Sequence, residues 1–433
     1  MMAARMQGDS RECDVVVIGG GFAGLSISLL LKQRGLKSVI LEKSERVGGK
    51  SRTLNLHGNV IELGTCFTAR DYRDVVALAE QYGVRTQPLG RASASPESVL
   101  GALYTKRIAT RFNSLSRMIA IMSSLQRYAR ERRKALARFD ARVASEYAAL
   151  AMPALDWLRR HRCQALEPVF LGVGDVYGYG PMKTMPALYA LRWVTPEMVI
   201  TAFTSTAKRL DVGFGELAER IAEETEIWRS QTLTHASRTP NGAWSLSTPG
   251  NSFNARHVVV ACAPKSSELL ELFDPTRRRI IENHVVSTPY FSVLVKAAHW
   301  FTNARRAFLR AGDHRDQLMI ARNDGPADDG GSYYVCFLCP TIADTSHIEA
   351  ILDRAIARDG GVLREIVEIR GWGDYMSRLD ADAIGCGSYA TLEDLQGAEN
   401  VWLSNSILAH ENWRDLLALN KRITDAICAA SQA

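Results

Sequence analysis

The N-terminal part of the chain alternates between short apolar runs and one stretch of helical periodicity. Residues 14–18 (DVVVI) and 38–41 (SVIL) are apolar runs of strand length. Between them, residues 25–36 place apolar side chains at helical spacing. The pattern predicts a strand, a helix and a second strand, in the order of a parallel βαβ unit.

A glycine-rich turn joins the first predicted strand to the helix. Gly19, Gly21 and Gly24 form a G-x-G-x-x-G arrangement directly after the apolar run. These glycines permit a tight turn, close approach of a pyrophosphate, and close packing of helix on strand. The N–H groups at the helix start, beginning with Phe22, favour phosphates. Glu42 follows at the distance expected for an acid that accepts ribose hydroxyls, and it disfavours a 2′-phosphate.

A second glycine loop helps to decide which of two dinucleotides, NAD or FAD, the turn would bind. Gly48, Gly49 and Lys50 follow Glu42, and residues 61–64 end another apolar run. An NAD domain usually continues into further βα units, whereas the longer FAD molecule needs a second cradle for its ribitol and ring system. We therefore expect FAD, with NAD as the alternative.

These motifs resemble the flavoprotein amine oxidase and phytoene desaturase superfamily, whose Gly-Gly-Arg/Lys loop lies along the flavin. The resemblance implies an α/β fold: a Rossmann-type FAD-binding domain with an interleaved substrate domain of mixed sheet plus helical cap. It also implies a late parallel strand at residues 254–264 and a strand at Gln231 that meets the adenine. The family's acidic pair near the C-terminus is replaced by Asn405-Ser406, so a carboxylate for the ribitol is missing there. The cofactor contacts implied by the resemblance are Gly19, Gly21, Phe22, Ala23, Gly24, Glu42, Lys43, Gly49, Lys50, Ser51, Gly64, Thr65, Gln231, Asn405 and Ser406.

The same resemblance divides the chain into interleaved units. A chain of 433 residues is too long for one compact core, which agrees with more than one unit. The FAD-binding domain is expected at 10–90, 205–285 and 385–433. A helical cap is expected at 91–204, and the sheet of the substrate domain at 286–384.

The middle of the chain resembles one branch of that superfamily, the bacterial FAD-dependent polyunsaturated fatty acid isomerases. The resemblance rests on the Tyr-Gly-Tyr-Gly run at 177–180 and on Pro-Ala-x-Tyr-x-Leu at 186–191. It implies that Tyr177 lies beside the flavin and that Arg91 holds a fatty acid carboxylate, which suits the planar guanidinium. An ordinary core tyrosine and a surface arginine are the alternatives. The expected walls of an apolar channel are Tyr177, Tyr179, Trp193, Met198 and Phe203.

Residues 104–142 combine an apolar stripe at helical spacing with a basic face. Eleven Lys or Arg and two acids give this window a charge of +9, so the rest of the +6 chain sums to −3. The cations are either solvated helix faces or a surface for an anionic partner, namely an acyl carrier protein or an anionic membrane surface. Because the rest of the chain is not basic, no nucleic-acid partner is expected. The apolar stripe comprises Ile108, Phe112, Leu115, Ile119, Met122 and Leu125.

The remaining composition changes the picture little. No apolar run approaches the ~18 residues that a spanning helix needs, and the N-terminal stretch is not of secretory type, so a soluble cytoplasmic protein is expected. Cys336 and Cys339 stand in an apolar stretch typical of a buried strand. We expect reduced core thiols there and no metal site.

The sequence contains no G-x-S-x-G or H-E-x-x-H motif, so the reaction is expected to depend on the flavin. Hydride transfer from a weak C–H bond to flavin N5, and its return to another carbon, would move double bonds without net oxidation. We therefore expect an FAD-dependent isomerase acting on a lipophilic unsaturated chain. Net oxidation, as in an amine oxidase or desaturase, is the alternative, and a non-catalytic nucleotide-binding protein is a third possibility.

Overall fold

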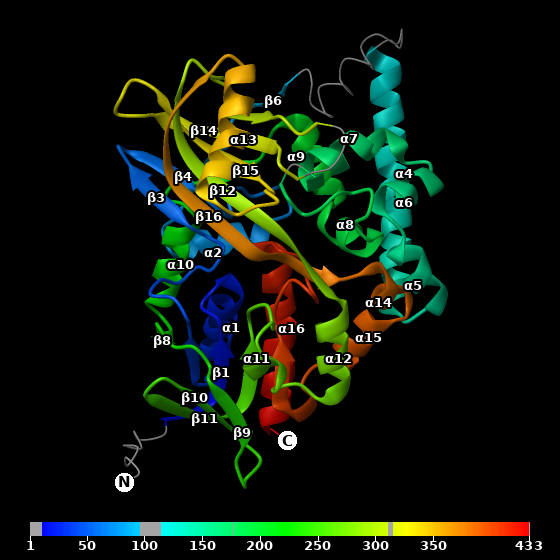
Figure 1. Ribbon diagram of the computed structural model, residues 1–433. Coiled ribbons are helices and arrows are strands. Elements are labelled where there is room, and N and C mark those ends of the chain that lie inside the picture. Colours follow the sequence, from blue (N-terminus) through cyan, green and yellow to red (C-terminus); the bar gives the residue numbers. More distant parts are fainter. Residues whose placement is uncertain (1–10, 96–113, 176, 311–314, 433) are drawn as a thin grey trace.

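The computed structural model describes residues 11–95, 114–175, 177–310 and 315–432 (Figure 1). Its strands form a seven-stranded sheet, a six-stranded sheet and two short two-stranded ones. The seven-stranded sheet lies in the lower half of Figure 1 and the six-stranded sheet in the upper half, with a group of helices beside them.

The predicted βαβ unit forms the centre of the seven-stranded sheet. β1 (Arg11–Ile18) pairs in parallel with β2 (Ser38–Leu41) and with β11 (Asn251–Val260), while α1 (Phe22–Gln33) connects β1 to β2. Both faces of β1 are covered, which explains its continuous apolar run. The strand order is β8-β2-β1-β11-β10-β9, and β17 also pairs with β11. The other strands are β8 (Glu226–Trp228), β9 (His235–Arg238), β10 (Trp244–Thr248) and β17 (Val401–Leu403).

Helices and short hairpins surround this sheet. Figure 1 shows the C-terminal helix α16 (Trp413–Gln432) beside α1, and the two helices contact each other. α10 (Phe214–Ala222) also contacts α1. The neighbouring elements are β3 (Thr53–Leu56), β4 (Asn59–Glu62), α2 (Arg73–Gln81), β5 (Thr86–Pro88), β7 (Lys208–Leu210), α11 (Ser267–Leu270), α12 (Pro275–His284), α14 (Ala381–Gly385), α15 (Ser388–Asp394) and η3 (Ala398–Asn400).

The six-stranded sheet has the order β16-β12-β15-β14-β13-β6 and is antiparallel except where β6 meets β13. Side chains alternate between its faces: Val293 and Val295 pack with α13, whereas Leu294 packs on the opposite side with Ile61. Cys336 and Cys339 are buried and unpaired in this region, as predicted. The bounds are β6 (Ala92–Ala94), β12 (Val285–Ala298), β13 (Arg305–Ala307), β14 (Leu318–Pro326), β15 (Ser332–Leu338), α13 (Thr345–Arg358) and β16 (Val362–Leu379).

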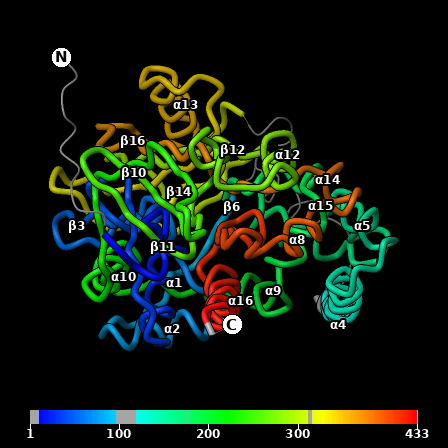
Figure 2. Tube along the Cα trace, turned by 90° about the horizontal axis from the view of Figure 1, so that it is seen from below, coloured from blue at the N-terminus to red at the C-terminus, as the bar shows by residue number. Residues whose placement is uncertain are grey.

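A helical part lies at one side of both sheets, and Figure 2 shows its long helix α4 (Ser114–Asp140) at the edge of the molecule. Part of the expected apolar stripe is not a core face, because Ile119 and Met122 are 60% and 50% exposed while Leu125 is buried. Ile108 and Phe112 lie outside the described residues. The other elements are α5 (Ala144–Ala151), α6 (Ala154–Arg160), η1 (Gln164–Leu166), α7 (Glu167–Phe170), the π-helical turn η2 (Leu171–Asp175), α8 (Ala187–Trp193) and α9 (Pro196–Thr204).

Several cations of the basic window hold this helical part together. Arg127 and Arg132 donate hydrogen bonds to carbonyl oxygens of neighbouring segments. Arg138 pairs with Glu146, and Arg142 forms ion pairs with Glu393 and Asp394 at the end of α15. Among the described side chains of the window, the cations without a hydrogen bond or ion pair are Arg133 and Lys134.

The predicted α/β fold class and the parallel strand within residues 254–264 are confirmed. The strand expected at 231–235 is wrong for all but its last residue: β9 begins at His235, and residues 231–234 precede it in a loop. The proposed domain boundaries stay a prediction. Within the described part of the chain, no helix has the length and apolar character needed to cross a membrane.

Candidate active site

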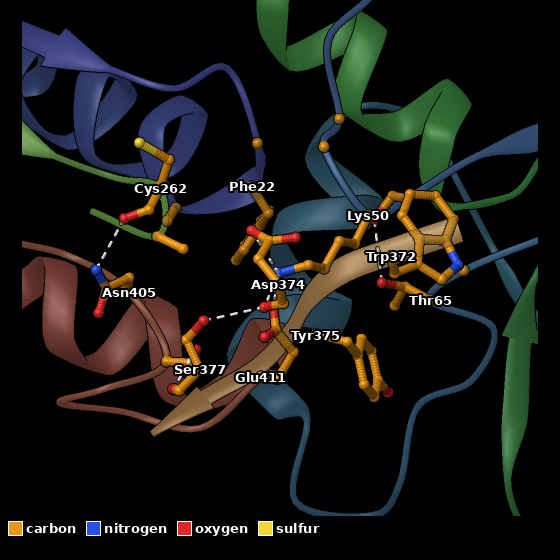
Figure 3. Close-up of a pocket in the computed structure, with 18 of the residues that line it drawn as sticks. Phe22, Lys50, Thr65, Cys262, Trp372, Asp374, Tyr375, Ser377, Asn405 and Glu411 are labelled. Atoms are coloured by element: carbon orange, nitrogen blue, oxygen red, sulfur yellow. Dashed lines mark hydrogen bonds and ion pairs between the residues drawn. The ribbon is translucent and has the colours of Figure 1, made fainter. Parts of the chain in front are cut away.

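A cavity of about 650 Å³ opens at the carboxyl ends of β1, β2, β11 and β17. This is the edge at which open α/β sheets bind their ligands. The cavity, called the main groove below, runs from the glycine turn after β1 along the second glycine loop to a group of aromatic side chains. Figure 3 shows part of it around Lys50.

The glycine turn brings the start of α1 to the floor of the main groove. Gly24 permits this packing, because a Cβ there would lie 1.9 Å from the carbonyl oxygen of Gly19. No side chain caps the N-terminus of α1, and its first turn carries no acid. Gly21, Phe22 and Ala23 line the groove, so the uncapped N–H groups can serve an anion. This geometry fits a pyrophosphate.

Glu42 lies in the groove at the end of β2. Its side chain is nearly buried, and its two carboxylate oxygens accept hydrogen bonds from the backbone N–H groups of Gly20, at 2.6 Å, and Ser44, at 2.8 Å. These bonds fix the carboxylate, which retains further lone pairs for hydroxyl groups of a ribose.

The second glycine loop packs directly on the first. Gly48 N–H donates to the Gly20 carbonyl at 2.8 Å, and a Cβ on Gly49 would approach the Gly21 Cα to 3.0 Å. Arg46, which also lines the groove, stabilises the loop, since its guanidinium donates to the carbonyls of Val47, Ser51 and Gly49. The two loops together form the wall that a long dinucleotide would follow.

Lys50 carries an ammonium group that lies between two carboxylates (Figure 3). Its Nζ is 3.0 Å from Glu411 Oε1 and 3.4 Å from Asp374 Oδ2, and the second Glu411 oxygen accepts the Met376 N–H. Burial acts to lower the pKa of Lys50, but the two carboxylates outweigh it and raise this pKa. The ammonium is therefore a fixed charge of the main groove.

The C-terminal pair Asn405 and Ser406 lines the groove, as expected. Asn405 Nδ2 donates to the Cys262 carbonyl at 2.9 Å (Figure 3). Ser406 Oγ donates to the Ser377 carbonyl at 2.7 Å. The pair therefore joins β17 to its neighbours. Besides Glu42, the carboxylates that line the groove are those of Asp374 and Glu411, both paired with Lys50. Sequence reasoning missed both acids, because only the tertiary fold brings them to Lys50.

Aromatic rings form the far end of the main groove. Tyr290 and Tyr375 stack with centroids 4.8 Å apart, and Tyr179 lies 5.5 Å from Tyr375. Gly178 has φ +73°, and a Cβ on it would lie 2.1 Å from Cε2 of the Tyr290 ring. Only glycine therefore fits between Tyr177 and Tyr179. Burial raises the pKa of Tyr179, Tyr290 and Tyr375, so these phenols stay neutral.

A second cavity, of about 190 Å³, adjoins the aromatic end and is called the side pocket below. It lies between β6, β13, η2 and α9, and it shares Phe67 and Tyr177 with the main groove. Most of its lining is apolar, including Met198 and Phe203. Among the described residues that line it, Arg305 alone carries a charge.

Arg305 is the functional candidate that the sequence did not reveal. Its guanidinium donates to Tyr177 Oη at 3.1 Å, while its buried Nε has no hydrogen-bond partner. Arg91, expected to hold a carboxylate, is exposed and lines neither cavity. Strand pairing explains why Arg305 lies at the pocket near the position expected for Arg91. β6 begins one residue after Arg91, and its Ala92 pairs with Arg305 on β13.

Most other predicted site residues meet in these two cavities. Trp193 is the exception among the expected walls: it is fully buried behind Tyr179, with ring centroids 4.1 Å apart, and lines neither cavity. Gln231 is also outside, because its amide oxygen accepts hydrogen bonds from the side chains of Thr248 and Asn251. Gly24 acts through packing alone. The predicted cofactor residues that line the main groove are Gly19, Gly21, Phe22, Ala23, Glu42, Lys43, Gly49, Lys50, Ser51, Gly64, Thr65, Asn405 and Ser406.

Comparison with known proteins gives relatives of two kinds. Amine oxidase [flavin-containing] B of Homo sapiens is 34% identical over 99 residues, covering 23% of this chain and 19% of that protein. The polyenoic fatty acid isomerase of Ptilota filicina is 23% identical over 261 residues, covering 55% of this chain and 51% of that protein. The chain thus matches about half or less of the length of these curated relatives.

Among solved structures, a CLA-producing fatty acid isomerase from P. acnes superimposes with a TM-score of 0.77 and 18% identity. The superposition covers 97% of this chain and 99% of that one, which shows a shared fold. The family model for flavin containing amine oxidoreductases matches residues 22–384. With that match over most of its length, and with a groove that fits a dinucleotide, the chain belongs to the flavin containing amine oxidoreductase family, and FAD is its cofactor.

Proposed function

We propose that this protein is an FAD-dependent isomerase that moves double bonds along a lipophilic unsaturated chain. The observation that carries the proposal is that the two cavities adjoin: Tyr177 and Phe67 line both the groove that fits FAD and the apolar side pocket. An acyl chain in the side pocket would reach the aromatic end of the main groove at this shared wall.

The proposed reaction depends on bound FAD to accept a hydride and return it to the same molecule. The glycine turn, Glu42 and the fixed ammonium of Lys50 bind and orient the cofactor. Tyr179, Tyr290 and Tyr375 exclude water from the reacting end, and their faces favour positive charge that develops on the substrate. These phenols are neutral and do not themselves act as ionised bases, which agrees with a reaction that needs no net proton transfer.

Substrate binding in this proposal uses Arg305 for an acidic headgroup and Tyr177, Tyr179 and Phe203 for the chain. Arg305 offers an unpaired Nε and a fork that suits a carboxylate, at a position inside the apolar lining. The substrate class is therefore an unsaturated fatty acid. A cytoplasmic location is part of the proposal and is supported by eight unpaired cysteines.

Net oxidation is the second candidate function, as in an amine oxidase. The family match and the stacked tyrosines favour it, since aromatic faces also suit a cationic amine.

Anaerobic incubation of the FAD-loaded protein with a panel of polyunsaturated acids separates the two. Isomerisation leaves the product mass unchanged and creates the ultraviolet absorbance of conjugated double bonds. A loss of two mass units, or peroxide formed in air from an amine, contradicts the isomerase proposal and supports net oxidation.

A further inference from the structure

The two helices that supply Ile121 and Phe203 to the side pocket also carry exposed apolar side chains. Six large apolar residues are markedly exposed in the described part of the chain, and three of them, Ile119, Met122 and Phe203, lie on these helices, α4 and α9. Phe203 is 44% exposed and lines the pocket, while Ile119 and Met122 lie on the exposed face of α4, the helix whose Ile121 lines the pocket. A concentration of this kind marks an interaction surface.

The exposed apolar residues lie on two adjoining helices. Ile119 and Met122 are one turn apart on α4, and Phe203 is at the end of α9, which contacts α4. In Figure 1, α9 and the upper half of α4 lie in the same part of the molecule. The segment after Phe203, residues 204–206, is exposed and carries no charge.

Three cations stand close to the side pocket, and these cations and the three exposed apolar residues together are called the rim below. Arg70 is exposed, and its N–H donates to Thr201 Oγ1 of the pocket lining at 3.3 Å. Arg91 and Lys208 are exposed chain neighbours of residues that line the pocket. None of the three side chains has a hydrogen bond or ion pair with another described residue.

Among the residues that the structure describes, acids around the rim do not balance these charges. Asp71 is engaged by Arg414, and Glu167 by Arg159 at 2.8 Å. Glu197, the exposed acid of α9, lies in the first turn of that helix, at the opposite end from Phe203. The rim is therefore apolar and positively charged.

We propose that this rim docks on the surface of an anionic lipid bilayer, with the side pocket opening toward the acyl chains. Apolar side chains that project from a surface enter the boundary between headgroups and acyl chains, and neighbouring cations attract anionic lipids. Docking would give a lipophilic substrate a path that avoids water. The docking itself requires no particular reaction, so it goes beyond the proposed function.

Sedimentation of the FAD-loaded protein with vesicles tests the proposal. The vesicles contain phosphatidylcholine alone or mixed with phosphatidylglycerol. Binding is expected to the anionic vesicles and to weaken with salt. The triple variant Ile119→Ser, Met122→Ser, Phe203→Ser should lose roughly tenfold or more in partition coefficient. The triple variant Arg70→Gln, Arg91→Gln, Lys208→Gln should lose about fivefold per cation.

Matched controls use residues of the same kinds elsewhere. Ile342→Ser with Val362→Ser removes equally exposed apolar groups away from the pocket, and Arg133→Gln with Lys134→Gln removes the unpaired cations of α4. Both control pairs should bind like the unsubstituted protein, and flavin absorbance reports that each variant is folded.

Three outcomes overturn the proposal: no binding of the unsubstituted protein, loss of binding in the control pairs instead, or salt-sensitive binding to an acidic acyl carrier protein without binding to vesicles. Turnover of a dispersed fatty acid without vesicles is measured separately. Docking and the proposed function can therefore fail independently.

Discussion

Arg305 and Arg91 lie close in the fold but differ in environment. Arg305 reaches into the side pocket and contacts Tyr177, whereas Arg91 is exposed. Arg305→Met is expected to raise the KM for a free unsaturated acid by roughly 10- to 150-fold, the value of one charge-assisted hydrogen bond. Its effect on the methyl ester should be much smaller, because the ester carries no charge. Steady-state kinetics on both substrates check this.

Arg91→Met provides the matched control for that prediction. It removes a neighbouring guanidinium that lines neither cavity, so the KM for the dispersed acid should stay close to its original value. An equal rise in KM for acid and ester in Arg305→Met would contradict the carboxylate role of Arg305. A larger rise in Arg91→Met would assign the carboxylate to Arg91.

His410 makes a second prediction at the scale of one residue. Burial against Trp193 and Tyr179 lowers the pKa of His410 from 6.5 to about 3, so the folded protein holds a neutral ring. The unfolded chain binds a proton below about pH 6.5, so this histidine reduces stability as the pH falls from 6.5 toward 3. The slope is at most about 1.4 kcal/mol per pH unit.

Urea unfolding at pH 6.5 and 5.5, for the unsubstituted protein and His410→Gln, measures this contribution. Glutamine cannot titrate, so the stability advantage of the unsubstituted protein should shrink by about 1 kcal/mol at the lower pH. All other titrating groups are common to both proteins. An advantage that is equal at both pH values would show that His410 can be protonated in the folded state.

At the scale of elements, the strand–turn–helix unit is both the best-predicted part of the fold and the most sensitive to added volume. Gly24→Ala would place a methyl group 1.9 Å from the Gly19 carbonyl oxygen, so α1 must move away from β1. We expect the purified protein to lose most of its FAD, and its free energy of unfolding to fall by about 1–3 kcal/mol. Flavin absorbance and urea unfolding measure the two effects.

Gly385→Ala is the control for this substitution. A Cβ at Gly385, at the end of α14, would meet only Ala151 Cβ at the ordinary distance of 3.7 Å. The variant should keep its FAD and its stability. A colourless Gly385→Ala, or a yellow and stable Gly24→Ala, would contradict the close-packing argument.

The elements show why sequence reasoning succeeded in some places and failed in others. The first βαβ unit and Glu42 were predictable because a local motif defines them. The two carboxylates that pair with Lys50 were not predictable, since Asp374 and Glu411 come from segments far from Lys50 in the sequence and no spacing links them. Arg305 was missed for the same reason, because it enters the side pocket through the pairing of β13 with β6.

At the scale of the whole molecule, a buried arginine, Arg322, connects the six-stranded sheet to the β3–β4 hairpin. Arg322 on β14 binds Asp324 through two nitrogens, each 2.7 Å from a carboxylate oxygen, and also donates to the Glu62 carbonyl of β4. Arg322→Met leaves the Asp324 charge buried and unpaired. The free energy of unfolding is expected to fall by about 3–5 kcal/mol.

Two comparisons test this connection by urea unfolding. The double variant Arg322→Met, Asp324→Leu should regain much of the stability, because no unpaired charge is left. Arg34 pairs with Asp425 at 2.6 Å on the surface, and Arg34→Met should cost less than about 1 kcal/mol. Equal losses for the buried and the exposed pair would show that Arg322 does not connect the two parts.

The π-helical turn η2 ends two residues before Tyr177 and has a consequence for the position of this tyrosine. Such a turn holds one residue more than an α-helical turn. Deleting one residue from 171–175 would restore the α-helical register and rotate the following chain by about 100°. A deletion of one codon here is therefore expected to move Tyr177 away from the boundary between the two cavities, while the residues of the dinucleotide-binding turn keep their sequence.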